Sequence, residues 1–457
     1  MKKALCIIII CLSSLTTGIG QTVIPLQKSS GGELKKAVFG FFPEKEYTKS
    51  REYIQYDLLS HLAIFSFELI SDGSFTTPDN WPWIDIINKA HNHGVKIIIS
   101  LENSNSEEFY NFLLDSHARK TFYNQLDQIT REYMLDGVNI NFEHLPVPSR
   151  NTMLNDFLLE MHDLLSIINP GAEVSFSGPA INAGGWDFAG LAASCDYIFI
   201  MGYDFKGAWS DHTGASAPLT GGFYNLTRTL EKEYADVVTT HPEKLILGIP
   251  YFGNKWLTNS REPHTEAIEH IRTYRYRKLI DESKEYGLLW DSVSQTPWYI
   301  IEENNNIYQV WFDNRESLAL KYDLADSYNI KGVGMWALGY DRDYTELWDE
   351  LRSRYLDTSS KKDTPRAQEP QIKVAPNPFV NETHISFQAA ASGNMIIRIF
   401  DSQGKQKSIT RQTYDLPFET VSFTIGTNLP QGSYYVRIIF ESEHNSVKKT
   451  SRILKIH

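Results

Sequence analysis

The stretch Leu135-Asp136-Gly137-Val138-Asn139-Ile140-Asn141-Phe142-Glu143 decides how this chain is organised. Read as a β-strand, it presents alternate side chains to opposite faces with a period of two. One face is then wholly apolar and carries Val138, Ile140 and Phe142. The other face is wholly polar and carries Asn139, Asn141 and Glu143. A strand with this pattern usually separates a hydrophobic core from water.

The polar face of this strand needs an explanation, because the neighbouring segments are apolar enough to be buried on both sides. Buried polar groups cost free energy unless they are hydrogen-bonded, and a buried carboxylate costs more. A closed barrel of parallel strands offers a solution: the apolar face packs on surrounding helices and the polar face points inward. Glu143 would then emerge at the carboxyl-end rim, where barrel enzymes carry out their chemistry.

Short apolar runs alternate with helical patterns from residue 35 to residue 355, which predicts repeated βα units and an α/β fold, a (β/α)8 TIM barrel. Eight strands are expected, the number that closes such a barrel: Ala37–Phe42, Leu62–Phe67, Val95–Leu101, Gly137–Glu143, Val174–Ser177, Tyr197–Tyr203, Leu245–Tyr251 and Gly332–Leu338. Helices are expected at Trp83–His93, Glu107–Tyr133 and Asn151–Ile168.

The connection before the eighth strand is far longer than ordinary loops. It predicts a small α+β insertion at about residues 254–329. Within it, the runs Tyr299–Ile301 and Tyr308–Phe312 flank Asn304-Asn305-Asn306, a pattern typical of a hairpin. We expect this insertion to form one wall of a cleft.

The composition changes after Tyr355. Residues 356–370 are polar and contain Pro365 and Pro370, as expected of a linker. Residues 371–457 read as a small all-β sandwich, with strands expected at Thr383–Phe387, Met395–Phe400, Val421–Ile425, Tyr434–Phe440 and Ser451–Ile456.

The first twenty residues have the pattern of a secretory signal peptide. Lys2 and Lys3 precede an apolar run, and small residues stand before a cut expected near Gln21. The run is too short to span a membrane comfortably, so no membrane span is expected in the mature protein. Cys195 would then be the only cysteine left of three, and we expect it to be a buried apolar side chain rather than a nucleophile.

The formal charge of −12 argues against nucleic acid as a partner, because phosphate binding favours a basic face. Aromatic residues make up 13% of the chain, and they include 10 Trp and 24 Tyr. Such rings serve as stacking platforms in sugar-binding clefts, although large cores explain most of them equally well. No cluster has metal-ligand spacing, and no glycine-rich phosphate loop follows a strand, so no cofactor or metal is expected.

Glu143 has two interpretations when it is considered alone. It could be a structural carboxylate paired with a lysine, an arginine or a backbone amide. It could also be a general acid that protonates a leaving group at the rim of the barrel. Glycosidases usually need a second carboxylate, yet the same face of this strand offers only Asn139 and Asn141. Another strand, or the substrate itself, would have to supply it.

The stretch 135–143 resembles the active-site signature of glycoside hydrolase family 18, the chitinase-like barrels. Met201-Gly202-Tyr203-Asp204 is similar to the Met-x-Tyr-Asp motif that closes strand six in this family. Trp336, within Gly334-Met335-Trp336-Ala337, is similar to the strand-eight tryptophan that floors the sugar site. The insertion, with Trp311-Phe312-Asp313-Asn314 and Ser317, resembles a bacterial branch that acts on chitin or cell-wall glycans.

This resemblance implies a mechanism in which the 2-acetamido oxygen of the substrate replaces the missing carboxylate. It implies that Glu143 is the acid and then the base, and that Tyr203 hydrogen-bonds the acetamido carbonyl. Trp336 would lie beneath the sugar ring and Asp204 would bind substrate hydroxyls or orient its neighbours. The resemblance further implies substrate contacts from Phe41, Asn139 and Met201. The alternative for Met201 is a role in barrel packing, and for Trp336, considered alone, a place in the core.

Position 141 departs from the family pattern, which mostly has Asp there. Asn141 can still accept from the acetamido N–H, but it brings no charge to the oxazolinium ion. A charged partner contributes on the order of 1–2 kcal/mol more than a neutral one, or about ten- to thirty-fold in rate. The strand-three motif is also altered, because Leu101 and Glu102 follow Ser100 where small residues are common.

The C-terminal region resembles the sorting domain read by type IX secretion machinery. Val374-Ala375-Pro376-Asn377-Pro378 opens it, Gly432-Ser433-Tyr434-Tyr435-Val436 lies near its end, and Ser451–Ile456 closes it. The alternative is a carbohydrate-binding sandwich. The resemblance implies export to the surface or surroundings of a Gram-negative bacterium.

Three functions therefore remain open. The first is a secreted retaining hydrolase that cleaves β-1,4 bonds at N-acetylglucosamine in chitin or a related glycan. The second is a chitinase-like lectin with weak or no catalysis, which Asn139 and Asn141 favour and Glu143 disfavours. The third is the same chemistry on peptidoglycan or on the core of an N-linked glycan. In each case we expect a monomer.

Overall fold

The computed structural model describes residues 23–27, 32–103, 105–143, 145–357, 373–388, 393–401, 405–414, 420–425, 427–441 and 446–456. The predicted signal peptide and most of the predicted linker lie outside the described residues. The chain divides into two compact units, Met1–Ser360 and Lys361–His457.

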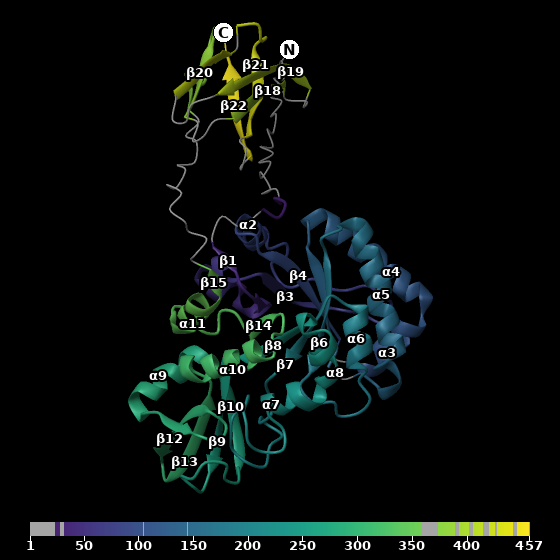
Figure 1. Ribbon diagram of the computed structural model, residues 1–457, viewed down its shortest axis with the longest axis vertical. Coiled ribbons are helices and arrows are strands. Elements are labelled where there is room, and N and C mark those ends of the chain that lie inside the picture. Colours follow the sequence, from purple (N-terminus) through teal and green to yellow (C-terminus); the bar gives the residue numbers. More distant parts are fainter. Residues whose placement is uncertain are drawn as a thin grey trace, which may run out of the picture. The chain divides into compact units, whose positions relative to one another are not determined.

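Eight parallel strands close into a barrel in the first unit, in the order β14-β2-β3-β4-β5-β6-β7-β8 (Figure 1). Their bounds are β2 Ala37–Pro43, β3 His61–Glu68, β4 Lys96–Glu102, β5 Gly137–Asn141, β6 Glu173–Pro179, β7 Tyr197–Met201, β8 Leu245–Pro250 and β14 Gly332–Trp336. Each falls on one of the eight runs expected from sequence. The predicted (β/α)8 barrel is therefore confirmed.

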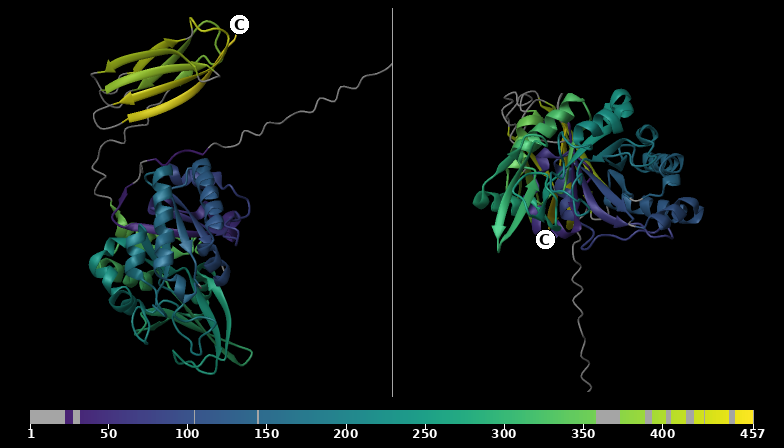
Figure 2. Two further views of the ribbon diagram at one scale, coloured as in Figure 1. Left: turned by 90° about the vertical axis from the view of Figure 1, so that its right-hand side faces the viewer. Right: turned by 90° about the horizontal axis from the view of Figure 1, so that it is seen from below.

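Helices surround these strands, as the right-hand view in Figure 2 shows. They are α1 Tyr47–Ser50, α2 Ile84–Asn92, α3 Ser106–Leu114, α4 Ser116–Tyr133, α5 Thr152–Ile168, α6 Phe188–Ser194, α7 Leu226–Arg228, α8 Ala235–Thr240, α10 Arg315–Ser327 and α11 Glu346–Tyr355. One prediction was wrong: the segment Glu107–Tyr133 is two helices. Asp115 separates them, because its side chain accepts hydrogen bonds from the backbone N–H groups of His117 and Ala118 and so caps α4.

The barrel has two apolar layers, as the period-two pattern of its strands requires. Val138 and Ile140 of β5 are fully buried in the outer layer, between strands and helices. A separate cluster fills the barrel interior, and it consists of Phe39, Phe41, Ala63, Ile98, Tyr197, Phe199 and Ile246. Cys195 is buried as expected, and burial raises the pKa of its thiol to about 12.

The insertion between β8 and β14 is a five-stranded antiparallel sheet with one helix, which Figure 1 shows beside the barrel. Its elements are β9 Phe252–Thr258, β10 Glu269–Arg275, α9 Tyr276–Tyr286, β11 Leu289–Asp291, β12 Thr296–Glu303 and β13 Asn306–Phe312. Asn304 and Asn305 adopt positive φ angles of 53° and 62° in the turn between β12 and β13. This is the backbone that a two-residue hairpin needs, and the predicted hairpin is confirmed.

The chain returns from the insertion to the barrel through a densely bonded turn. Asn314 caps α10 in a capping box with Ser317. Asp313 forms an ion pair with Lys321, and both side chains are almost completely buried. Ser317 donates a further hydrogen bond of 2.6 Å to Asp313. The motif Trp311-Phe312-Asp313-Asn314 thus has a structural role here.

We predict that Asp313→Asn lowers the free energy of unfolding by about 3–5 kcal/mol, because it leaves the buried Lys321 ammonium without a counter-charge. Asn314→Ala, which removes only the cap, should cost about 1 kcal/mol. Urea unfolding measures both. An Asp313→Leu/Lys321→Met double variant should recover much of the loss; equal stability of Asp313→Asn and the wild type would contradict the argument.

The C-terminal unit consists of two antiparallel sheets, β16-β17-β20 and β19-β18-β21-β22. The strands are β16 Lys373–Ala375, β17 Thr383–Gln388, β18 Gly393–Asp401, β19 Gln406–Tyr414, β20 Thr420–Ile425, β21 Gly432–Glu441 and β22 Ser446–Lys455. Neither β16 nor β19 was among the strands expected from the sequence. In β19, residues 406–410 are exposed and mostly polar, so no alternating apolar signal marks this strand.

No helix within the described ranges combines the length and apolar character that a bilayer-spanning segment needs.

Candidate active site

The polar residues of interest lie at the carboxyl end of the barrel. Glu102, Asn141, Met201 and Trp336 are the last residues of β4, β5, β7 and β14. Glu143 follows β5 by two residues, and Tyr203 follows β7 by two residues. Because all eight strands are parallel, these residues share one rim, where active sites form in this fold.

Asn139 lies one layer deeper and is completely buried inside the barrel. Its amide oxygen accepts hydrogen bonds from Ser100 Oγ (3.0 Å) and Ser177 Oγ (3.1 Å). Its amide nitrogen donates to Ser175 Oγ (3.0 Å). All three partners are side chains of β4 and β6, and Asn139 lies one layer below Asn141 at the rim.

Glu143 is exposed, and Asn141 is 6% exposed. Asn141 Nδ2 donates a long hydrogen bond of 3.4 Å to Glu143 Oε1. Among the described residues, no lysine or arginine lies within ion-pair distance of Glu143. The carboxyl group is thus available at the rim, and this arrangement disfavours the purely structural interpretation of Glu143.

Asp136, the first carboxylate of the signature stretch, lies at the opposite end of the same strand. It accepts hydrogen bonds from the backbone N–H of Ile97 (2.8 Å) and faces His91 Nε2 at 2.8 Å. These contacts join β4, β5 and α2 at the amino-terminal face of the barrel. Residues at the amino-terminal face of such a barrel contribute to stability rather than to catalysis, so we assign Asp136 a structural role.

Tyr203 is partly buried and packs with the aromatic cluster of the barrel interior. Burial raises the pKa of its hydroxyl well above the usual value, and the negative charges of Glu143 and Asp204 raise it further. The hydroxyl therefore stays protonated at neutral pH and is able to donate a hydrogen bond.

Asp204 keeps an exposed edge, but the surrounding protein removes much of the water from its carboxyl group. This desolvation raises the pKa of Asp204 to about 6, and the negative charge of Glu143 acts in the same direction. A hydrogen bond of 3.4 Å from Ser216 Oγ opposes the rise. Asp204 has a positive φ of 60°, and its backbone N–H donates to Ser216 Oγ at 3.0 Å.

Trp336 is partly exposed and rests on aromatic neighbours. Its ring centroid lies 5.4 Å from that of Phe41 and 4.7 Å from that of Phe65. Phe41 is only 1% exposed and packs beside Trp336 on the neighbouring strand, whereas Trp336 itself borders the cleft. Met201 is partly buried and packs against the same interior cluster.

Glu102 is a rim residue that was not among the expected site residues. It pairs in register with Asn141, and it accepts a hydrogen bond from Ser66 Oγ. Burial raises the pKa of its carboxyl group, and the negative charge of Glu143 contributes to the rise. In the sequence, Glu102 stood out only because small residues are common at its position after Ser100 and Leu101. The strand register shows in addition that it stands beside Asn141.

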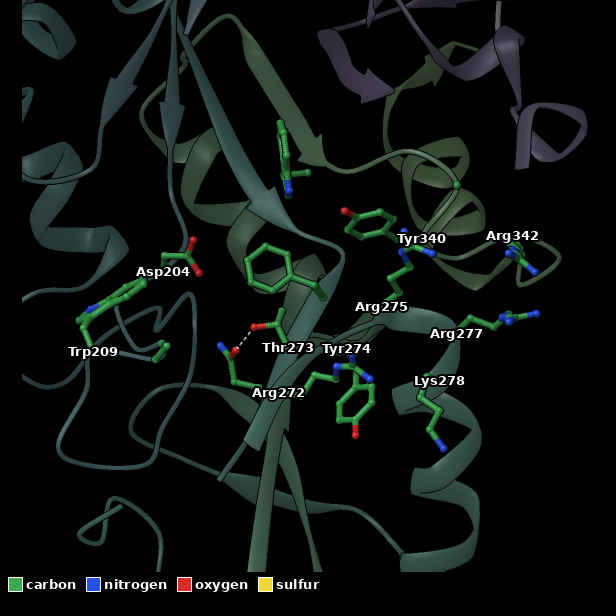
Figure 3. Close-up of a pocket in the computed structure, with 16 residues that line it drawn as sticks. Asp204, Trp209, Arg272, Thr273, Tyr274, Arg275, Arg277, Lys278, Tyr340 and Arg342 are labelled. Atoms are coloured by element: carbon green, nitrogen blue, oxygen red, sulfur yellow. Dashed lines mark hydrogen bonds between the residues drawn. The ribbon is translucent and has the colours of Figure 1, made fainter. Parts of the chain in front are cut away.

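A cleft of about 690 Å³ runs from Asp204 and Trp336 along the inserted sheet (Figure 3). Figure 3 shows Asp204 and Trp209 on one side, with Arg275, Tyr340 and Arg342 on the other. The insertion thus forms a wall of this cleft, as its position in the sequence suggested. Within the described ranges, His, Cys, Asp and Glu side chains do not gather in groups of three that could hold a metal ion.

Comparison with known families identifies both units. Residues 37–341 match the model of the glycosyl hydrolases family 18, which spans most of the chain. The chain belongs to family 18. Residues 373–453 match the secretion system C-terminal sorting domain, in agreement with the type IX resemblance, so this family 18 protein carries a tail that directs bacterial proteins to secretion or the cell surface.

Curated relatives of this family 18 chain include human di-N-acetylchitobiase, which is 26% identical over 58% of this chain and 75% of the relative. A cortical fragment-lytic enzyme of Bacillus subtilis is 25% identical over 62% of this chain and 65% of the relative. Family members thus include hydrolases with different names and sources.

Solved structures agree in fold. A family 18 chitinase from Cycas revoluta in complex with (GlcNAc)3 is 21% identical, with a TM-score of 0.60 over 69% of this chain and 99% of that one. The spore cortex-lytic enzyme SleL of Bacillus cereus is 18% identical, with a TM-score of 0.59 over 71% of this chain and 74% of that one.

We predict that Asp204→Asn raises the melting temperature at pH 7.5. The carboxyl pKa is about 6 in the folded protein against an ordinary 3.8, so the folded state binds the proton more tightly. Wild-type stability therefore falls as the pH rises through this window, and the loss is complete above about pH 7. Asparagine does not ionise, so the difference should vanish below about pH 4.

The control is Asp211→Asn, because His212 lowers the pKa of the exposed Asp211 carboxyl group. This variant should show no gain at pH 7.5. A lower melting temperature for Asp204→Asn than for the wild type at pH 7.5 would contradict the assigned direction of the pKa shift.

Proposed function

We propose that this family 18 protein is an exported retaining hydrolase that cleaves β-1,4 bonds next to N-acetylglucosamine in chitin or a related glycan. The observation that carries the proposal is the exposed carboxyl group of Glu143, free of basic partners among the described residues, above Asn141 at the carboxyl rim. The binding of (GlcNAc)3 by the Cycas revoluta chitinase supports the substrate class.

In the first step, the acetamido oxygen of the bound sugar attacks its own anomeric carbon while Glu143 gives its proton to the leaving oxygen. The glycosidic bond breaks, and an oxazolinium ion forms on the sugar. In the second step, Glu143 takes a proton from water and the water oxygen bonds to the anomeric carbon. The bond between that carbon and the acetamido oxygen breaks, so the oxazolinium ring opens and the acetamido group is restored. Two displacements at one carbon retain its configuration.

The neighbouring residues would orient and stabilise the reacting group. The protonated hydroxyl of Tyr203 can donate to the acetamido carbonyl, and Asn141 can accept from the acetamido N–H. Trp336 offers an aromatic face for the sugar ring. Asn139 would act at one remove, since its hydrogen bonds hold β4, β5 and β6 in register beneath Asn141.

Glu102 could supply part of the negative charge that is missing at position 141. Its carboxylate stands on the adjacent strand, level with Asn141, and is held by Ser66. A negative charge there would stabilise the oxazolinium ion in part, although from farther away than an aspartate at position 141.

We predict that Glu143→Gln lowers kcat on N-acetylglucosamine oligomers at least 100-fold, because glutamine can neither give nor take the proton. The measurement is product release from the oligomers, with the melting temperature as a check on folding. Activity near that of the wild type would exclude the proposed mechanism.

The same assay separates an enzyme from a lectin. A hydrolase releases product in a single turnover with enzyme in excess. Saturable binding of chitin by the wild-type protein, without product under those conditions, would show the lectin instead.

We predict that Asn141→Asp raises kcat by up to about ten- to thirty-fold, or leaves it unchanged, because the added carboxylate stabilises the oxazolinium ion. The gain should be larger in a Glu102→Gln background, where one like charge is removed. Steady-state kinetics on the four proteins test this. A large loss of kcat in Asn141→Asp would show that Asn141 has a separate, adapted role.

The sorting domain supports export from a Gram-negative bacterium by type IX machinery. We propose that the mature protein acts as a monomer, at the cell surface or released from it. Light scattering of the purified protein checks the oligomeric state.

A further inference from the structure

The cleft beside the catalytic rim is lined by many positive charges, although the chain as a whole has a formal charge of −12. Five of the sixteen residues that line it are cationic: Arg272, Arg275, Arg277, Lys278 and Arg342. Asp204 is the one carboxylate among them. The wall that they form, here called the basic wall, comes from β10, the start of α9 and the loop after β14 (Figure 3).

Three of these cations form no ion pair within the described residues, although Arg277 lies near enough to Asp281 to help lower the pKa of that carboxyl group. Arg275 pairs with Glu46 at 2.7 Å, and Lys278 pairs with Glu282 at 2.5 Å. Arg272, Arg277 and Arg342 form no ion pair with any carboxylate that the structure describes. Unpaired arginines that share one wall repel one another, and this repulsion is relieved when an anion binds.

The basic wall is held firmly against the barrel. Glu46, the partner of Arg275, is fully buried near the rim, and Arg275 also stacks over the Tyr340 ring at 5.0 Å. The backbone N–H of Arg277 donates to the Tyr340 carbonyl oxygen at 3.0 Å. Tyr276 Oη donates to Glu346 at 2.8 Å. These contacts hold the Arg275 guanidinium group and the backbone at Arg277 in place beside the barrel.

An aromatic ring faces the basic wall from the other side. Trp209 is 68% exposed and lines the same cleft, opposite Arg275 in Figure 3. An exposed indole face suits a pyranose ring. A sugar beside the one bound at Trp336 would thus meet an aromatic platform on one side and guanidinium groups on the other.

We propose that the basic wall binds a carboxylate carried by the sugar next to the cleaved N-acetylglucosamine, so that the substrate is an acidic glycan in which the two sugars alternate. The inference rests on the proposed function and narrows its substrate class. The arginines of the wall indicate a carboxylate, because the planar guanidinium group can donate two parallel hydrogen bonds to both oxygens of a carboxylate. Neutral chitin would leave the arginines unpaired.

Two glycans share this chemistry, and the experiment distinguishes them. Peptide-free glycan strands of peptidoglycan place a lactyl carboxylate on the sugar that follows N-acetylglucosamine, and hyaluronan places a uronic acid there. The neutral controls are the same polymers after reduction of their carboxylates to alcohols, together with chitin oligomers. We expect wild-type kcat/KM to be about tenfold or more higher on one acidic glycan than on its reduced form.

The preference should weaken with ionic strength, because the wall is open to solvent. Between 20 mM and 500 mM NaCl, the ratio of kcat/KM on acidic and reduced glycan should fall several-fold. This measurement needs no variant. A ratio near one at low salt on both polymers would overturn the proposal.

The variant Arg272→Gln/Arg277→Gln removes two unpaired charges from the wall, and we expect it to lower the acidic-to-reduced ratio about tenfold. The matched control, Lys120→Gln/Lys232→Gln, removes two charges from exposed lysines outside the cleft and should keep the wild-type ratio. Arg272→Lys/Arg277→Lys should keep an intermediate ratio, since charge remains without the fork. Equal ratios in all four proteins would overturn the proposal.

Binding to Glu143→Gln keeps this test separate from the proposed function. Calorimetry of that variant with the acidic and the reduced glycan measures the affinity that the basic wall contributes, without turnover. Preference for the acidic glycan, lost in the added Arg272→Gln/Arg277→Gln background, supports the wall even if the wild type releases no product. Equal binding of both glycans overturns it even if the wild type hydrolyses chitin.

Discussion

The parallel pairing of β14 with β2 closes the barrel, and the arrangement of the rim depends on it. This pairing sets Trp336 level with Phe41, so the ring at the rim rests on the aromatic interior. Around the barrel, the same closure places the last residues of β4, β5 and β7 at one height. Residues that lie between positions 102 and 336 of the sequence thereby come together at one rim.

The barrel was predictable because its signal is local. Each strand carries an apolar run, and helical patterns separate the runs. The error at Glu107–Tyr133 arose where the apolar period continues through Asp115, a residue whose capping bonds decide the break. The strand β19 was not predicted, because its exposed residues, such as Gln406 and Lys407, show no apolar alternation.

The site was predictable only in part. Glu143 and Asn141 are neighbours in sequence, so alternation alone placed both on the inward face. Glu102 became visible only through register, since no sequence rule says that it stands level with Asn141. The basic wall depends on the fold of the insertion, where β10 lies at the edge of the sheet and its arginines face a cleft that the barrel completes.

The inserted sheet enters and leaves the barrel through paired strands, since β9 and β13 are hydrogen-bonded neighbours with Gly253 opposite Phe312. The gap that the insertion bridges is therefore one strand spacing wide, about 5 Å. An insertion of this kind can become longer or shorter, or be replaced, without a change in how the barrel closes. The chemistry and the choice of substrate can thus diverge independently in proteins built on this plan.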